Sequence, residues 1–81
     1  MKAIETRYYG PTNTRGSRIR AFDLDGNSVS IPYPYDLSGE GCHAAAAKAL
    51  CKKMNWHGKL ASGALERGYV FVWCIGGDYQ V

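Results

Sequence analysis

Apolar and polar residues alternate in three stretches within the first 33 residues of the chain, and a period of two is typical of half-buried β-strands. Segments rich in turn-forming glycine, proline, asparagine and aspartate separate these stretches. The pattern therefore predicts an antiparallel meander of three strands. The strands are expected at residues 2–9, 17–23 and 28–33, and Pro32 and Pro34 are expected to end the strand pairing.

A helical period follows the meander. Ser38 is the expected N-cap, and Glu40 lies in the first turn, where a negative charge suits the helix dipole. Residues 44–47 are all alanine, a strong helix former whose short side chain lets a helix pack closely on a sheet. Residues 55–58 are expected to end the helix. A mainly apolar stripe falls at helical spacing and consists of His43, Ala46, Ala47, Leu50, Cys51 and Met54.

The last part of the chain is predicted to form a hairpin. A weaker strand at residues 59–65 turns at an ERG segment into a stronger strand at residues 69–74, and residues 76–81 are expected to be a mobile tail. The predicted fold is α+β in a single compact domain spanning residues 1–81. It is an antiparallel sheet of four to five strands with one helix packed on one face, in the order βββαββ.

A single helix covers only one face of such a sheet, so the opposite face stays open. If the helix covers the side of Ile4, Ile19 and Val70, alternation gathers arginine and aromatic side chains on the open face. Such residues are enriched at protein–protein hot spots, and they also stack on bases and pair with phosphates. The candidate binding residues are Arg7, Tyr9, Arg18, Arg20, Phe22, Tyr69, Phe71 and Trp73, with Arg15 in the turn before the second strand.

The last strand has a second reading, because all the residues that alternate along it are apolar. A shift of one residue sends every side chain to the other face. Phe71 and Trp73 would then belong to the core, and the open face would carry valine and cysteine. Arg18 and Arg20 would be solvated charges at a sheet edge, where charge discourages aggregation. Alternation alone leaves both readings open.

Composition narrows the class of protein. The 81 residues are 46% hydrophobic and carry a net charge of +3, which is typical of one small globular domain and argues against an acidic mimic of DNA. The first ten residues lack the apolar segment of a signal peptide, and the longest apolar run, residues 69–75, is too short to span a membrane. The three cysteines show no paired spacing. We expect a cytoplasmic protein without a membrane segment or a disulfide framework.

One segment resembles a catalytic motif. AFDLDGNS is similar to the first motif of haloacid-dehalogenase-type phosphatases, in which Asp23 would be the nucleophile and Asp25 the general acid and base. This chain has Asn27 where that family has threonine or valine, and it is too short for the family's parallel sheet. Cys42 and His43 are helix neighbours that point about 100° apart, so they form no nucleophile–base pair. We expect no catalytic residue, no metal site and no cofactor.

The opening IETRYYGPTNTRGSRIRA, the helix and the YVFVW segment together resemble small uncharacterised proteins of phages, prophages and other mobile elements. In size and in its single compact core, the chain is also similar to anti-CRISPR and other anti-defence proteins. That resemblance implies a non-enzymatic inhibitor that binds a protein partner, such as a host nuclease complex, and blocks it sterically. The alternative is a nucleic-acid-binding protein that uses the same face. A homodimer is compatible with both.

Overall fold

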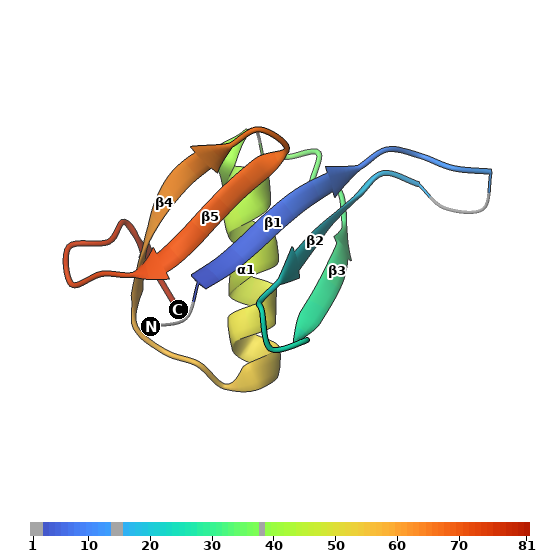
Figure 1. Ribbon diagram of the computed structural model, residues 1–81. Coiled ribbons are helices and arrows are strands. Elements are labelled where there is room, and N and C mark those ends of the chain that lie inside the picture. The colour runs from blue at the N-terminus through green and yellow to red at the C-terminus, as the bar shows by residue number, and fades with distance from the viewer. Residues whose placement is uncertain (1–2, 14–15, 38) are drawn as a thin grey trace.

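The computed structural model describes residues 3–13, 16–37 and 39–81, which form an antiparallel sheet of six strands and one α-helix (Figure 1). The α+β class predicted from the sequence is confirmed, with one strand more than the upper number expected. Along the chain the elements are β1 (Ala3–Tyr9), β2 (Arg18–Phe22), β3 (Ser28–Pro32), α1 (Glu40–Met54), β4 (Lys59–Leu65), β5 (Gly68–Trp73) and β6 (Tyr79–Gln80).

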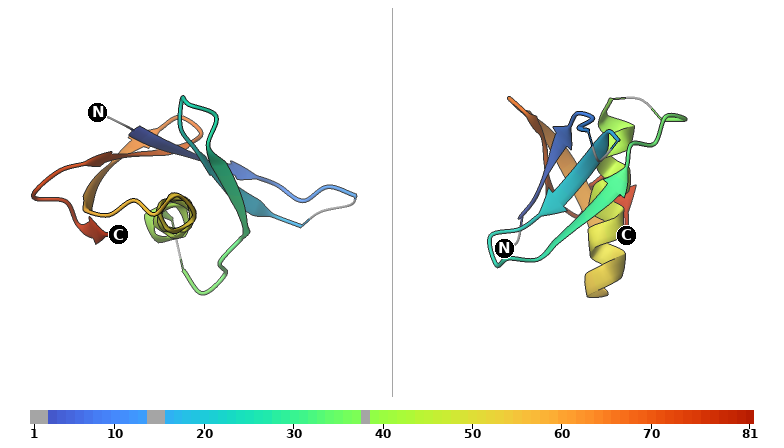
Figure 2. Two further views of the ribbon diagram at one scale, coloured as in Figure 1. Left: turned by 90° about the horizontal axis from the view of Figure 1, so that it is seen from below. Right: turned by 90° about the vertical axis from the view of Figure 1, so that its right-hand side faces the viewer.

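The strands lie side by side in the order β3-β2-β1-β5-β4-β6, and all neighbours are antiparallel. The predicted meander of β1, β2 and β3 and the predicted hairpin of β4 and β5 are both present. Strand β1 joins these two parts, because Thr6 lies opposite Ala21 of β2 on one side and opposite Tyr69 of β5 on the other. Figure 2 shows that the sheet curves around α1, which lies on the concave side.

Helix α1 has a residue with a positive φ at each end. Gly39 is the N-cap with a φ of 50°, a conformation that glycine adopts without strain. Ser38, the predicted N-cap, lies outside the described residues. Asn55 ends the helix with a φ of 60°, as the sequence predicted, and the next N–H, that of Trp56, donates to the carbonyl oxygen of Cys51 at 2.8 Å.

The core lies between α1 and the concave face of the sheet. Ala46, Ala47 and Leu50 are fully buried, as the helical spacing predicted, and they belong to the same cluster as Ile4 and Ile19 from the sheet. The alanines bring the helix backbone close to the strands, because they interpose so little side chain. The contacts of α1 are mainly with β1, β2, β3 and β5.

The aromatic side chains of β5 face the core, which is the second of the two arrangements that the sequence left open. Phe71 lies opposite Ile4, and both residues are 0% exposed. By alternation Tyr69 and Trp73 also face the helix, and the two valines of β5 face away from it. The expectation that the aromatic residues of this strand lie on the open face is therefore wrong. The rings of β5 fill the space beside the helix, where Phe71 packs against Tyr79 and Trp73 against Trp56, and large aromatic rings fill that space better than valine does.

Where a mobile tail was expected, residues 79–80 form β6 on the outer edge of β4. Gly58 and Val81 extend this pairing, because each donates its N–H to the carbonyl oxygen of the other, at 3.1 and 2.8 Å. The chain reaches this edge by passing Gly77 so close to Leu60 that a Cβ on Gly77 would lie 2.4 Å from the Leu60 carbonyl oxygen. Only glycine fits at position 77, so this residue permits a tight connection where a mobile tail was expected.

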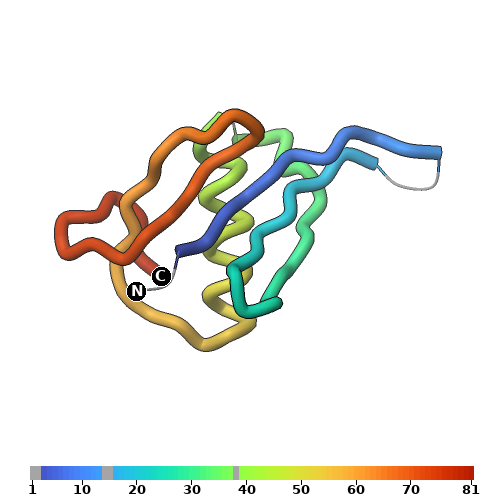
Figure 3. Tube along the Cα trace, viewed as in Figure 1, coloured from blue at the N-terminus to red at the C-terminus, as the bar shows by residue number. Residues whose placement is uncertain are grey.

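The connection between β1 and β2 projects from the body of the molecule (Figure 3). Its described parts are residues 10–13 and 16–17. The protein is elongated along one direction, with extents of 41 × 25 × 22 Å. Arg15, one of the candidate binding residues, falls in this connection and lies outside the described residues.

Candidate functional site

Strands β1 and β2 place five of the candidate residues on the face of the sheet opposite α1. Arg7 lies opposite Arg20 and Tyr9 lies opposite Arg18, and their neighbours in each strand, such as Thr6 and Ile19, are buried against the helix. We name this group the arginine–aromatic face and define it as Arg7, Tyr9, Arg18, Arg20 and Phe22.

Cation–π contacts hold the arginine side chains of this face in place. The guanidinium carbons of Arg7 and Arg20 lie 5.5 and 5.3 Å from the centre of the Phe22 ring. The guanidinium carbon of Arg18 lies 5.3 Å from the centre of the Tyr9 ring. The guanidinium groups of Arg7 and Arg20 therefore share the ring of Phe22. The guanidinium group of Arg18 lies on a separate ring, that of Tyr9.

Polar partners satisfy these arginines only in part. Arg7 Nε donates to Glu5 Oε2 at 2.9 Å, an ion pair on the same face. Arg18 Nη1 is buried and has no hydrogen-bond partner among the described residues. A buried guanidinium donor without a partner is costly to keep, so Arg18 is the least satisfied of the three arginines.

An apolar strip lies beside the arginine–aromatic face on the same side of the sheet. Strands β5 and β4 contribute small side chains to it, and we define the strip as Ala61, Gly63, Leu65, Val70 and Val72. Where the apolar strip meets the arginine–aromatic face, there is a hollow of about 140 Å³. It is lined by Ala3, Glu5, Phe22, Asp23, Leu24 and Val70. Arginines and aromatic rings thus lie beside an apolar area that no element covers within the described part of the chain.

The other three candidate residues do not join this face. Tyr69 packs on the ring of His43, with 4.9 Å between the ring centres. Phe71 contacts Tyr79 in an edge-on arrangement at 5.7 Å. Trp73 packs edge-on against Trp56 and donates its indole N–H to a backbone carbonyl, that of His57, at 3.0 Å. All three belong to the core side of the sheet, so a partner on the open face would not touch them.

A histidine and a threonine meet in the interior. Thr6 Oγ1 and His43 Nδ1 share a hydrogen bond of 2.8 Å, and Thr6 Oγ1 also lies 3.3 Å from the carbonyl oxygen of Tyr69. His43 is buried between helix and sheet, and this burial lowers the pKa of its imidazole. Burial thus favours the neutral ring, and the hydrogen bond between His43 and Thr6 links α1 to β1.

The Asp23 segment, which resembles a phosphatase motif, forms a turn. Asp23 Oδ1 accepts hydrogen bonds from the backbone N–H groups of Asp25 and Asn27, at 2.9 and 3.0 Å. Its other oxygen, Oδ2, accepts one from Asn27 Nδ2 at 3.0 Å. Both oxygens of the carboxylate thus hold the β2–β3 turn, as turn chemistry predicted.

A cluster of tyrosines near the start of α1 escaped the sequence analysis. Tyr33 lies between Tyr8 and Tyr35, with 5.5 and 5.1 Å between the ring centres, and Tyr35 is 81% exposed. A hydrogen bond with Cys42 raises the pKa of the Tyr33 hydroxyl. The segment YPYDL carries the only available signal, since two tyrosines flank a proline there. Periodicity offered no reason to place them beside Tyr8 of a distant strand.

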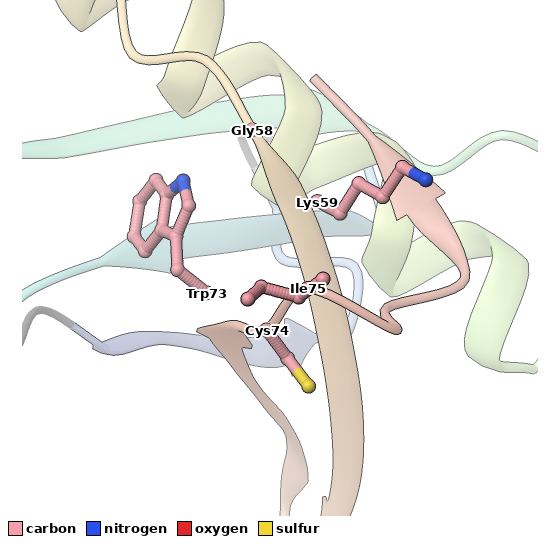
Figure 4. A pocket seen from close by; sticks show the side chains of 5 residues that line it. All are labelled: Gly58, Lys59, Trp73, Cys74 and Ile75. Atoms are coloured by element: carbon pink, nitrogen blue, oxygen red, sulfur yellow. The ribbon is translucent and has the colours of Figure 1, made fainter.

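A hollow at the start of β4 has a volume of about 410 Å³ and is lined by Gly58, Lys59, Trp73, Cys74 and Ile75. Figure 4 shows that Trp73 and Lys59 point to opposite sides of β4. Polar groups therefore do not converge on a shared point, as they do in a catalytic or ligand site.

The described residues contain no group of three or more His, Cys, Asp or Glu side chains that could hold a metal ion. Cys42 and Cys51 are buried free thiols, and burial raises the pKa of the Cys51 thiol. Cys74 is free and exposed. Within the described ranges, no helix has the length and apolar character needed to cross a membrane.

Comparison of the chain with protein-family models, with curated proteins and with solved structures found no match. The function therefore has to be argued from the open face itself.

Proposed function

We propose that this chain is a small non-enzymatic binding protein whose open sheet face docks on an acidic surface of a protein partner and blocks that surface sterically. The observation that carries the proposal is the two-part open face. Arginines fixed on aromatic rings lie beside the apolar strip of β4 and β5. Protein interfaces combine an apolar centre with enriched arginine and aromatic residues in the same way.

The cation–π contacts favour tight binding because they limit side-chain motion before the partner arrives. A free arginine loses much rotamer entropy when a partner immobilises it, whereas a guanidinium already held on a ring loses less. Arg7 and Arg20 are held on Phe22, and Arg18 is held on Tyr9. Their unused N–H groups can donate to carboxylates of the partner.

Charge indicates the kind of partner surface. The open face carries three arginines on β1 and β2 against one carboxylate, Glu5, which is already paired with Arg7. The whole chain has a net charge of +3. A complementary surface is therefore acidic. An acidic surface differs from the channel of a nuclease that holds nucleic acid, because such a channel is basic.

Two features favour a protein partner over nucleic acid. The ring of Phe22 already contacts two guanidinium groups, which leaves less of its face free to stack on a base. The apolar strip offers no donor to a phosphate backbone, whereas phosphate contacts supply most of the affinity in nucleic-acid binding. The apolar strip would thus make no contact with the phosphates in a nucleic-acid complex.

The partner class we propose is a host nuclease complex of a phage-defence system. The support for this class is the resemblance of the chain to small phage and mobile-element proteins and its size, which matches that of anti-CRISPR proteins. A rigid domain of this kind inhibits by occupying an interface that the complex needs. It requires no active site of its own.

The test compares two double variants in a host cell with an active nuclease defence. Arg18→Ala/Arg20→Ala removes two charges from the open face, and Lys48→Ala/Lys52→Ala removes two exposed charges from α1, on the other side of the sheet. The parent and the lysine variant should protect an invading phage, and the arginine variant should lose this protection. With the purified complex, affinity should fall by about 30-fold or more for the arginine variant.

A different result would identify the other function. If the parent binds mixed single-stranded or duplex nucleic acid with an affinity that falls steeply with salt, and leaves the defence complex active, the proposal is wrong. If both double variants protect the phage as well as the parent does, the arginine–aromatic face is not the binding surface.

A further inference from the structure

Strand β4 has an outer edge that is only partly covered. Strand β6 pairs with it at two positions, Lys59 opposite Gln80 and Leu60 opposite Tyr79. Residues 61–65 pair with β5 on their inner side and with no strand on their outer side within the described part of the chain. A strand edge of this kind is a template for pairing with another chain.

The hydrogen-bond pattern identifies which groups face outward. Cys74 N–H donates to the carbonyl oxygen of Lys59 at 2.9 Å, so Lys59 bonds inward, toward β5. Gly58 bonds outward, because it exchanges two hydrogen bonds with Val81. In an antiparallel ladder this direction alternates from residue to residue. Ser62 and Ala64 therefore present their N–H and C=O groups at the uncovered edge.

The two edges of the sheet differ in their protection. At the β3 edge, Pro32 has no N–H to offer, and Lys53 Nζ donates to the carbonyl oxygen of Ser28 at 2.8 Å. Residues 60–65 of β4, with the sequence LASGAL, contain no proline and no charge, and their register with β5 is continuous, without a bulge. The edge of β4 thus lacks the features by which edge strands avoid pairing.

We propose that two copies of this chain form a dimer by antiparallel pairing of their β4 edges, centred on Gly63. In this register Ser62 of each copy lies opposite Ala64 of the other, and all the outward-facing groups of both residues find partners. A shift by two residues in one direction would drive the second copy into β6, and a shift in the other direction would place Ser62 opposite the β4–β5 turn.

Side chains agree with this register. Leu65, which is 44% exposed, would lie opposite Ala61 of the second copy on the open face, and both positions belong to the apolar strip. A twofold axis perpendicular to the sheet would keep both helices on one side and both arginine–aromatic faces on the other.

Cysteine cross-linking tests the register in a Cys74→Ser background, where the exposed native thiol is absent. Two Gly63→Cys residues would lie directly opposite each other, within disulfide distance, and a Cβ at Gly63 meets only ordinary contact with Val70 at 3.5 Å. The matched control, Ala61→Cys, lies on the same strand and face, but its two copies would be about 14 Å apart. Mild oxidation should link Gly63→Cys at least tenfold faster than Ala61→Cys.

Sedimentation of the unmodified protein provides an independent measurement. The parent should associate as its concentration rises toward about 1 mM, and Ser62→Pro, which removes one outward N–H, should remain monomeric while its circular dichroism spectrum stays that of the parent. A parent that stays monomeric at that concentration, or equal cross-linking at both cysteine positions, would overturn the proposal. Pairing of this edge with a strand of a different protein would appear as the first of these results.

Discussion

Phe71 and Val72 are neighbours in the chain that lie on opposite faces of β5, so their side chains contribute differently to stability. Phe71 is fully enclosed beside Ile4, whereas Val72 lies on the open face. Phe71→Ala should lower the free energy of unfolding by about 3–5 kcal/mol, because it leaves a cavity in the core. Val72→Ala should lower it by roughly 1 kcal/mol. Urea denaturation measures both, and a larger loss at Val72 would contradict the assigned faces.

His43 should make stability depend on acidity. Burial lowers its pKa in the folded protein below the value of about 6.5 that it has when unfolded. The unfolded chain then binds the proton more readily, so the contribution of His43 is present above pH 6.5 and is lost as the pH falls through the folded pKa. Melting temperature should therefore drop below pH 6.5 in the parent.

The matched variants for this effect are His43→Gln and His57→Gln, since the His57 side chain is exposed. His43→Gln should flatten the dependence of melting temperature on pH between pH 5 and 7, and His57→Gln should leave it as in the parent. An unchanged slope in His43→Gln would show that other groups cause the dependence.

At the scale of elements, β6 is anchored to the start of α1. The Tyr79 hydroxyl donates to the Glu40 carboxylate, and this hydrogen bond raises the pKa of Tyr79 to about 12. Lys48 lies 5.7 Å from the centre of the same ring. The bond exists only while the phenol keeps its proton. Its stabilisation is complete below pH 10, the unfolded pKa of tyrosine, and is lost as the pH rises through about 12.

Tyr79→Phe separates this bond from other alkaline effects. The parent should melt at a higher temperature than the variant by a constant amount between pH 7 and 9, and that difference should shrink between pH 10 and 12. Thermal melts followed by circular dichroism measure it. A difference that persists unchanged at pH 12 would mean that the phenol of Tyr79 does not anchor β6 through Glu40.

Elements with a clear period could be predicted from the sequence, and those without one could not. Alternation located β1, β2 and β3, and the alanine-rich stripe located α1. The face of β5 stayed open because Val70 and Phe71 are both apolar, and only pairing with β1 decides between them. Strand β6 has two residues, Tyr79 and Gln80, which are too few to show any period.

At the scale of the whole molecule, the candidate site could be predicted only in part, because the period of a segment does not show which strand it pairs with. Arg7, Arg18 and Arg20 alternate with buried residues, so their shared face followed from the sequence. The apolar strip depends on β1 lying next to β5, and the tyrosine cluster depends on Tyr8 reaching Tyr33. Both depend on pairings between segments far apart in the chain, which periodicity does not specify.

Strand β1 lies between β2 and β5, so one of its two edges stays unpaired during synthesis until the ribosome has made β5. Synthesis adds about 5–20 residues per second, so β1, β2 and β3 emerge seconds before β5. During that interval one edge of β1 is unpaired and Ile4 lacks its neighbour Phe71, which exposes the nascent meander to pairing with other chains. Codons that slow translation between residues 33 and 68 should therefore increase the share of newly made protein that aggregates, with no change in the amino-acid sequence.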